Sequence, residues 1–260
     1  MATLAPSAAP ERKRRSEAQS FFILACLMAA TIVAGFLLNI VMGRSTFASP
    51  LIVHVHGITF MGWLGITLTQ MRFAAAGPLG LHRKLGWISV VYVPWMVLMG
   101  FLVMRHSLQT TGGPFFFAQN EFLWGNGTAL VAFAATIGWA IARRRDTAAH
   151  SRLMLCAFSV LTGPGLGRLL PEPLLIPYAW DTVVVATLIW PAIGMALDHR
   201  RHGSVHRAWF QGVALIVGLQ VAAQLIAYSP IGIAATRSVI AGTPGADRPM
   251  AAFLPPDFGA

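Results

Sequence analysis

The stretch Phe21–Met42, FFILACLMAATIVAGFLLNIVM, carries no charged side chain over its 22 residues. At 1.5 Å per residue, a helix of this length measures about 33 Å, which is enough to cross the hydrocarbon core of a bilayer. The run Arg12-Lys13-Arg14-Arg15 precedes it, and signal peptides also begin with a positive stretch. A signal peptide, however, has an apolar core of only about 7–15 residues. We therefore predict a retained membrane-spanning helix near the start of the chain.

Six further apolar runs follow the first one. They cover residues 51–72, 86–104, 121–142, 151–169, 178–197 and 208–228. The chain of 260 residues is 56% hydrophobic and only 11% charged, whereas soluble domains carry about 25% charged residues. Water would not tolerate the apolar surface of such a chain, so lipid must be its solvent. The sequence predicts an all-α, polytopic membrane helix bundle with seven transmembrane helices over residues 21–228.

The basic residues predict the orientation of this bundle, because cytoplasmic loops are enriched in Lys and Arg. Fourteen of the 19 basic residues fall before the first run and in every second loop, in clusters such as Arg83-Lys84, Arg143–Arg145 and Arg200-Arg201. We expect the N-terminus inside and the C-terminus outside a bacterial cytoplasmic (inner) membrane, with the basic side against anionic lipid headgroups. Residues 1–20 would be a cytoplasmic basic tail, and the Pro/Gly/Ala-rich residues 229–260 a loosely ordered outer tail.

The net charge of +10 does not indicate nucleic-acid binding. The basic clusters lie between apolar runs and are not interleaved with aromatic residues, as a base-stacking surface would require. The sequence also lacks a P-loop, a dinucleotide-type glycine fingerprint and a haem c attachment motif. These function classes are excluded, and the chemistry must come from polar groups within the bundle.

Ionisable residues near the outer ends of the predicted spans form one candidate group, since such residues are costly in a membrane and often functional. Glu121, Asn126, Arg168 and Asp181 could line a pocket for a small molecule such as an anion, with Arg168 as counter-ion to an acid. His56, Glu121 and Asp181 could instead bind zinc or iron in a metal-dependent enzyme. The alternative is that each residue only touches water and headgroups at the membrane interface.

The fifth run contains Gly163-Pro164-Gly165-Leu166-Gly167 and is the weakest of the seven. Proline removes a backbone donor and glycine loosens the helix, so we expect a kink or a break. Broken helices line binding cavities in transporters. Stretches of small residues also allow close packing between membrane helices, and the sequence leaves both interpretations open.

Histidines at matched depths on different helices could hold haem b from both faces, because a neutral imidazole is a good axial ligand. His82 and His150 form the inner candidate pair. The outer candidates are His54 or His56 with His106. His54 and His56 point about 200° apart on a helix, so one would be the ligand and the other a hydrogen-bond partner. The alternative for His82 and His150 is a cap at a helix start or a contact with lipid phosphate.

Two stretches carry a resemblance to a known family. Leu81-His82-Arg83-Lys84-Leu85-Gly86-Trp87 and His150-Ser151-Arg152-Leu153-Met154, the second followed by Arg168 and Pro171, resemble motifs of a family of predicted bacterial membrane proteins of unknown function. That family is in turn similar to the two-haem transmembrane cytochromes b. Cys156 departs from the pattern, which has an arginine early in that helix. The resemblance covers about half of the chain and implies a membrane fold and haem.

The sequence thus favours a haem b-binding membrane redox protein that transfers electrons. Two alternatives remain: a non-redox protein that binds or transports a small molecule in an outer-leaflet polar cavity, and a metal-dependent membrane enzyme. A fourth possibility is an accessory or assembly subunit whose partner is a membrane complex.

Overall fold

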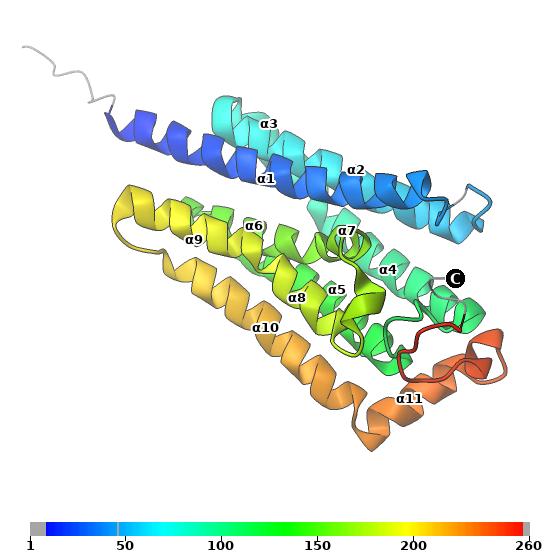
Figure 1. Ribbon diagram of the computed structural model, residues 1–260. Helices are drawn as coiled ribbons and strands as arrows, with labels where there is room; N and C mark the ends of the chain where they lie inside the picture. Colours follow the sequence, from blue (N-terminus) through cyan, green and yellow to red (C-terminus); the bar gives the residue numbers. More distant parts are fainter. Residues whose placement is uncertain (1–8, 46, 257–260) are drawn as a thin grey trace, which may run out of the picture.

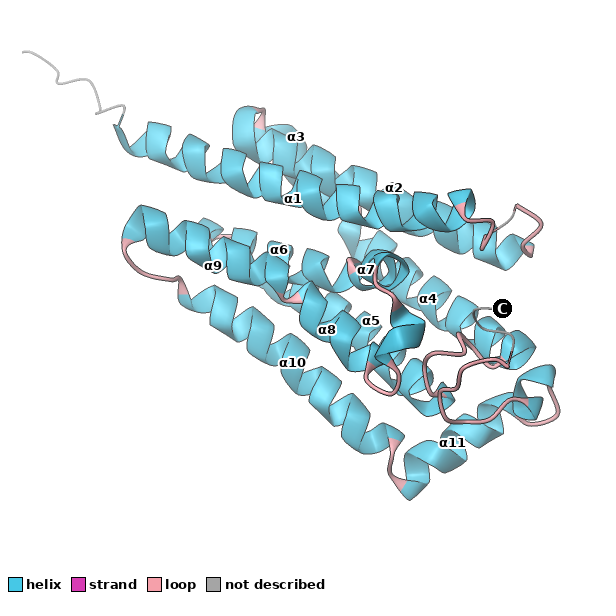
Figure 2. Ribbon diagram, in the orientation of Figure 1, coloured by secondary structure: helices cyan, strands magenta, loops and turns pink. Residues whose placement is uncertain are grey.

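The computed structural model describes residues 9–45 and 47–256, so the start of the predicted basic tail, Thr46 and residues 257–260 lie outside it. Within these ranges every regular element is a helix (Figure 2). The elements are α1 (Ala9–Val41), α2 (Leu51–Ala76), α3 (Leu79–Gly86), α4 (Ser89–Thr111), α5 (Gln119–Ala142), α6 (Thr147–Leu161), α7 (Gly163–Leu169), η1 (Glu172–Leu175), α8 (Ala179–Thr187), α9 (Ile189–His202), α10 (Arg207–Ala227), α11 (Pro230–Ile240) and η2 (Pro244–Asp247).

Six stretches of the described residues are helical, long and apolar enough to cross a membrane. They are Arg15–Val41, Leu51–Ala76, Ser89–Thr111, Gln119–Ala142, Ala179–His202 and Arg207–Ala227. The predicted all-α, multi-pass membrane architecture is therefore supported. The predicted fifth span is helical too, but it is divided into α6 and α7, and neither piece is long enough to cross alone.

The break in the fifth run lies where the sequence predicts it. Pro164 has no N–H to donate to the carbonyl of Val160, which weakens the helix at this point. Thr162 separates the two pieces but keeps a right-handed helical backbone, with φ −74° and ψ −18°. The backbone therefore stays in the helical region at the junction, while the axis turns from α6 into α7 (Figure 1).

The glycines of α7 allow close packing rather than an open helix. A Cβ atom added to Gly165 would lie 2.7 Å from the Cα of Ile32 in α1, and one added to Gly35 would collide with the backbone of Gly165. Helices approach this closely only where both lack side chains. Of the two interpretations of this run, the structure favours the close-packed small-residue face.

The bundle has two chemically different ends (Figure 1). The starts of α1, α3, α6 and α10 and the end of α9 lie together at one end, and with them the clusters Arg83-Lys84, Arg143–Arg145 and Arg200-Arg201. We call this the basic end. Residues 42–45 and 47–50 and the loops 112–118 and 170–178 lie at the opposite end, together with α11.

The expectation of a loosely ordered C-terminal segment is wrong for residues 229–256. Ser229 caps α11 by accepting a hydrogen bond from the N–H of Gly232. Beyond α11, Arg248 donates to the carbonyls of Gly112, Gly113, Phe115 and Phe117. Composition does not predict this order, because it depends on one guanidinium that donates to four carbonyls of a helix C-terminus and a loop. These carbonyls lie far from Arg248 in the sequence, so no local pattern reveals the contact.

Candidate functional site

Two histidines from different helices meet at the basic end. Pro78 precedes the short helix α3, which lies beside the end of α2, and the Nδ1 of His82 is 3.1 Å from the carbonyl of Gln70. Asp146 caps α6 by accepting from the N–H of Ala149, and this bond lowers the pKa of the Asp146 carboxyl. The cap sets His150 on the first turn of α6, with its Nδ1 2.8 Å from the carbonyl of Ala140.

The two imidazole rings are 6.3 Å apart between centroids, with an angle of 86° between their planes. Since a carbonyl only accepts, each Nδ1 must carry a proton, and in the neutral ring each Nε2 then has a free lone pair. Metal-ligating histidines are commonly held in this way, by a backbone carbonyl on the other ring nitrogen. Two imidazoles on opposite sides of one metal ion, each at about 2 Å, would have centroids about 6 Å apart. The spacing of the two rings is compatible with two ligands of one metal ion.

The outer histidines are not paired in this way. The Nε2 of His54 lies 3.2 Å from the carbonyl of Phe47, which occupies one ring nitrogen. The rings of His56 and Phe60 lie 4.4 Å apart between centroids, tilted by 34°, and the buried Nδ1 of His56 has no hydrogen-bond partner in the described chain. Among the ring contacts between described residues, none joins His106 to His54 or His56. The outer axial pair stays a prediction without a contact to support it.

A buried ion-pair network, which the sequence did not single out as a site, also lies at the basic end. Arg152 of α6 donates from Nε and Nη2 to both oxygens of Asp198 in α9, at 2.7 and 2.6 Å. Its Nη2 also reaches Glu17 of α1 at 2.5 Å. The side chains of Arg152 and Asp198 are 3% and 1% exposed, so each charge depends on the other.

Asp198 has further partners that complete this network. Its Oδ2 accepts from the indole N–H of Trp209 at 3.0 Å and from the backbone N–H of His206 at 3.2 Å. Arg152 and Asp198 together thus connect four helices, because Glu17 of α1 pairs with Arg152 while α10 binds Asp198. The sequence contains a signal for Asp198 as a buried ion-pair partner. It is an acidic residue at the end of an apolar run, and a basic cluster follows it.

Glu17, Asp198 and His202 form a group whose ligand atoms lie within 4.8 Å of one another. Arg152 already pairs with both carboxylates, and His202 is 3.8 Å from Glu17. A divalent cation would have to share these oxygens with a guanidinium, so we interpret the group as an ion-pair network. Among the described residues, His56, Glu121 and Asp181 do not form a group of this kind.

The four residues of the predicted outer pocket do not form one site. Arg168 lies on the ring of Phe36 at 4.1 Å and donates to the carbonyl of Pro164, which orients it toward α1. Asn126 donates to the carbonyl of Phe122 within its own helix. Glu121 and Asp181 lie with α10 instead, so no contact supports Arg168 as their counter-ion.

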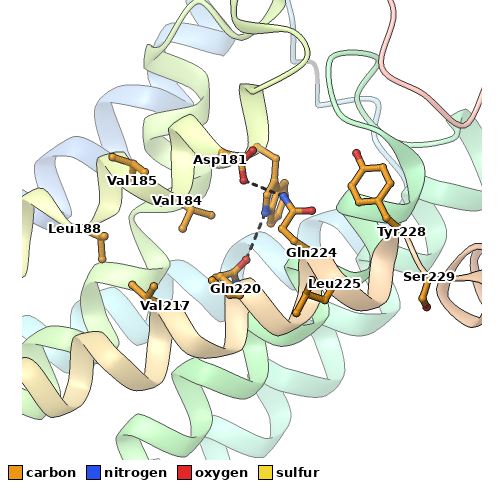
Figure 3. A pocket seen from close by; sticks show the side chains of 12 residues that line it. Asp181, Val184, Val185, Leu188, Val217, Gln220, Gln224, Leu225, Tyr228 and Ser229 are labelled. Atoms are coloured by element: carbon orange, nitrogen blue, oxygen red, sulfur yellow. Dashed lines mark hydrogen bonds between the residues drawn. The ribbon is translucent and has the colours of Figure 1, made fainter.

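Asp181 lies at the polar end of a groove between α8 and α10 (Figure 3), and Glu121 lines a neighbouring hollow. Glu121 accepts a hydrogen bond from the hydroxyl of Tyr228 at 2.6 Å, and Asp181 accepts one from the amide of Gln224 at 2.9 Å. The groove has a volume of about 580 Å³, and a neighbouring hollow of about 330 Å³ shares Asp181, Gln224 and Tyr228 with it. Its walls are apolar, with Val184 and Leu188 on one side and Val217 and Val221 on the other.

Cys156, where the resembled family has an arginine, is completely buried in α6. A Cβ atom added to Gly212 of α10 would lie 2.8 Å from its sulfur, so a long side chain at 156 would meet α10. No family model, curated protein sequence or solved structure matches this chain. The candidate chemistry therefore rests on the His82–His150 pair at the basic end and the acidic groove at the opposite end.

Proposed function

We propose that this multi-pass membrane protein binds haem b through His82 and His150 and acts in electron transfer. The observation that carries the proposal is the arrangement of the two rings. They lie 6.3 Å apart between centroids, and each Nδ1 is engaged by a backbone carbonyl. The resemblance of the segments around both histidines to a family similar to two-haem transmembrane cytochromes b supports the same assignment. Haem b in such a site would supply one-electron redox chemistry, with a potential set by its axial ligands and their burial.

The chain's own residues would fix the ligand geometry. The carbonyls of Gln70 and Ala140 hold each imidazole in the tautomer whose Nε2 is free, and they raise the basicity of that nitrogen. Asp146 holds His150 indirectly, because the cap sets where α6 begins. His82 comes from a separate eight-residue helix, so the spacing between the rings depends on how α3 packs against α2.

We also propose seven spans in a bacterial inner membrane, with the N-terminus inside and the C-terminus outside. The gathering of basic clusters at one end of the bundle (Figure 1) supports a cytoplasmic location for that end. The start of α6 lies at the basic end and the loop 170–178 after α7 lies at the opposite end (Figure 1), which supports a seventh crossing made by the two pieces over 147–169. Anionic headgroups would then contact the basic end.

A visible absorption spectrum of detergent-purified, haem-supplemented protein tests the haem proposal. We expect the sharp α-band of reduced haem b after dithionite, and its loss in His82→Ala and in His150→Ala. The matched control is His199→Ala, an exposed histidine at the basic end, which should leave the band unchanged. A featureless spectrum from folded wild-type protein would contradict the proposal, as would a band that survives both substitutions.

A further inference from the structure

The groove between α8 and α10 combines an acidic end with apolar walls. Glu121 is only 6% exposed, and Asp181 is exposed toward the groove. In the ranges that the structure describes, neither carboxylate forms an ion pair with a basic side chain, since the ion pairs there join Arg152 or His202 to Glu17 and Asp198. Two carboxylates near apolar walls without a cation are costly, and an external positive charge would offset that cost.

The hydrogen bonds at this end leave an acceptor open. The hydroxyl of Tyr228 donates to Glu121, and one N–H of the Gln224 amide donates to Asp181. The Oε1 of Gln224 is buried and has no donor among the described residues. The groove end therefore presents oxygen acceptors and negative charge, which is the complement of a charged N–H donor.

The apolar walls continue away from this end along both helices. Asp181 and Leu188 are seven residues apart, which is about 10 Å along a helix. The rim carries exposed apolar side chains, with Val185 at 65% and Leu225 at 73% exposure. In a membrane these side chains face lipid, so the groove is reached from the bilayer rather than from water.

We propose that this groove binds a membrane-soluble amine, with its protonated nitrogen at Glu121, Asp181 and Gln224 Oε1 and its apolar body between Val184 and Val217. The chemistry excludes the anionic ligand that the sequence suggested, because Arg168 does not reach the site. A neutral alcohol would fill the walls but leave the charge of the two acids without a partner. The site is independent of the histidine pair, which lies at the basic end of the bundle.

Binding of radiolabelled n-octylammonium to the full chain in phosphatidylcholine nanodiscs tests the proposal. We expect saturable binding above that of empty nanodiscs, with competition by unlabelled octylammonium and not by octanol or octanoate. Glu121→Gln and Asp181→Asn keep the size and an acceptor oxygen of each side chain, and each should weaken binding about tenfold, as expected for the loss of one charge-assisted contact. The matched control is Asp247→Asn, an exposed acid outside the groove, which should bind like wild type.

A second variant separates ligand binding from folding. Val221 lines the groove and is 54% exposed, so Val221→Trp fills the groove without disturbing the core and should abolish binding with all acids in place. Three outcomes would overturn the proposal. They are binding that does not saturate, equal competition by octanol, and unchanged affinity in both Asp181→Asn and Val221→Trp. The haem spectrum of these variants should match wild type, so failure here is distinguishable from failure of the histidine site.

Discussion

Arg152 and Asp198 are charged side chains buried among apolar ones, and their mutual contacts hold four helices together. The guanidinium bonds both carboxylate oxygens of Asp198, and Asp198 accepts two further bonds from α10 and the residue before it. Such a network is strongly destabilised when one partner is removed, because the other charge stays buried without compensation. The network therefore stabilises the folded state only when both charged partners are present.

We expect Asp198→Ala to destabilise the protein by about 3–5 kcal/mol, the range for a broken buried ion pair. Equilibrium unfolding in mixed micelles measures this change. Arg200→Ala removes an exposed charge from the same helix and should change stability little. Combining Asp198→Leu with Arg152→Met removes both charges and should recover part of the loss. Equal destabilisation by Arg200→Ala would contradict the role of the network.

Glu172 is a carboxyl of the opposite kind, since it is buried without a partner. It is 1% exposed, and neither oxygen has a hydrogen-bond partner in the described chain. Burial raises the pKa of Glu172 from its ordinary 4.5 to about 7, because desolvation disfavours the charged form. A raised carboxyl pKa means that the folded state holds the proton more tightly than the unfolded state does.

The stabilising contribution of Glu172 is therefore complete below about pH 4.5 and is lost as the pH rises through about 7. We expect stability to fall by up to about 3 kcal/mol over this window, read as the unfolding midpoint against pH. Glu172→Gln should remove this part of the pH dependence and be more stable than wild type at pH values above 7. Asp247→Asn serves as the control and should keep the wild-type profile. A profile for Glu172→Gln that parallels wild type would exclude this origin.

At the scale of elements, the crossing of α1 and α7 depends on two glycines. Gly35 and Gly165 let the two backbones touch, and Arg168 extends the same contact by lying on Phe36. Lipid gives helices no hydrophobic reason to associate, so close packing of this kind is a main source of stability in membrane bundles. The break at Thr162 is tolerated because α7 is held by α1.

We expect Gly165→Ala to destabilise the bundle by about 1–3 kcal/mol, because the new methyl group would overlap the backbone of α1. Gly138→Ala in α5 and Gly218→Ala in α10 have open space around the new Cβ atom and should be neutral or slightly stabilising. Thermal unfolding of the three variants in one detergent makes the comparison. Equal midpoints for all three would show that the α1–α7 contact is dispensable.

At the scale of the whole molecule, the count of crossings decides on which side the C-terminus lies. Six stretches meet the length and hydropathy of a span on their own, and α6 with α7 makes the seventh in our proposal. An odd count places α11 and η2 across the membrane from the N-terminus. An even count would place both ends together and would bring the Arg200-Arg201 cluster to the outer face.

We expect a C-terminal alkaline phosphatase fusion to be active and a C-terminal green fluorescent protein fusion to stay dark, because the first folds only outside and the second only inside the inner membrane. The internal control is the same pair of reporters fused after Arg145, where the expected signals are reversed. Fluorescence from the full-length fusion would show that α6 and α7 do not cross, and would contradict the seven-span topology.

The sequence by itself determined the long apolar helices and indicated lipid as their solvent. These are local features with local physical consequences. The length of an uncharged run such as Phe21–Met42 sets whether a helix can span the membrane, and the basic clusters indicate the cytoplasmic side. Pro164 interrupts its helix. The sequence predicts the pairing of His82 with His150 from depth alone, and their rings lie 6.3 Å apart between centroids.

Tertiary structure decided which polar residues meet. Arg168 turned to α1 and not to Glu121, Asp198 became the centre of the basic end, and Arg248 fixed a segment that composition suggested would be loose. Depth in the membrane follows from position along a helix, which the sequence contains. The direction in which a side chain points around the bundle follows from helix crossings, and these are set by close contacts such as that of Gly35 with Gly165 between residues far apart in the chain.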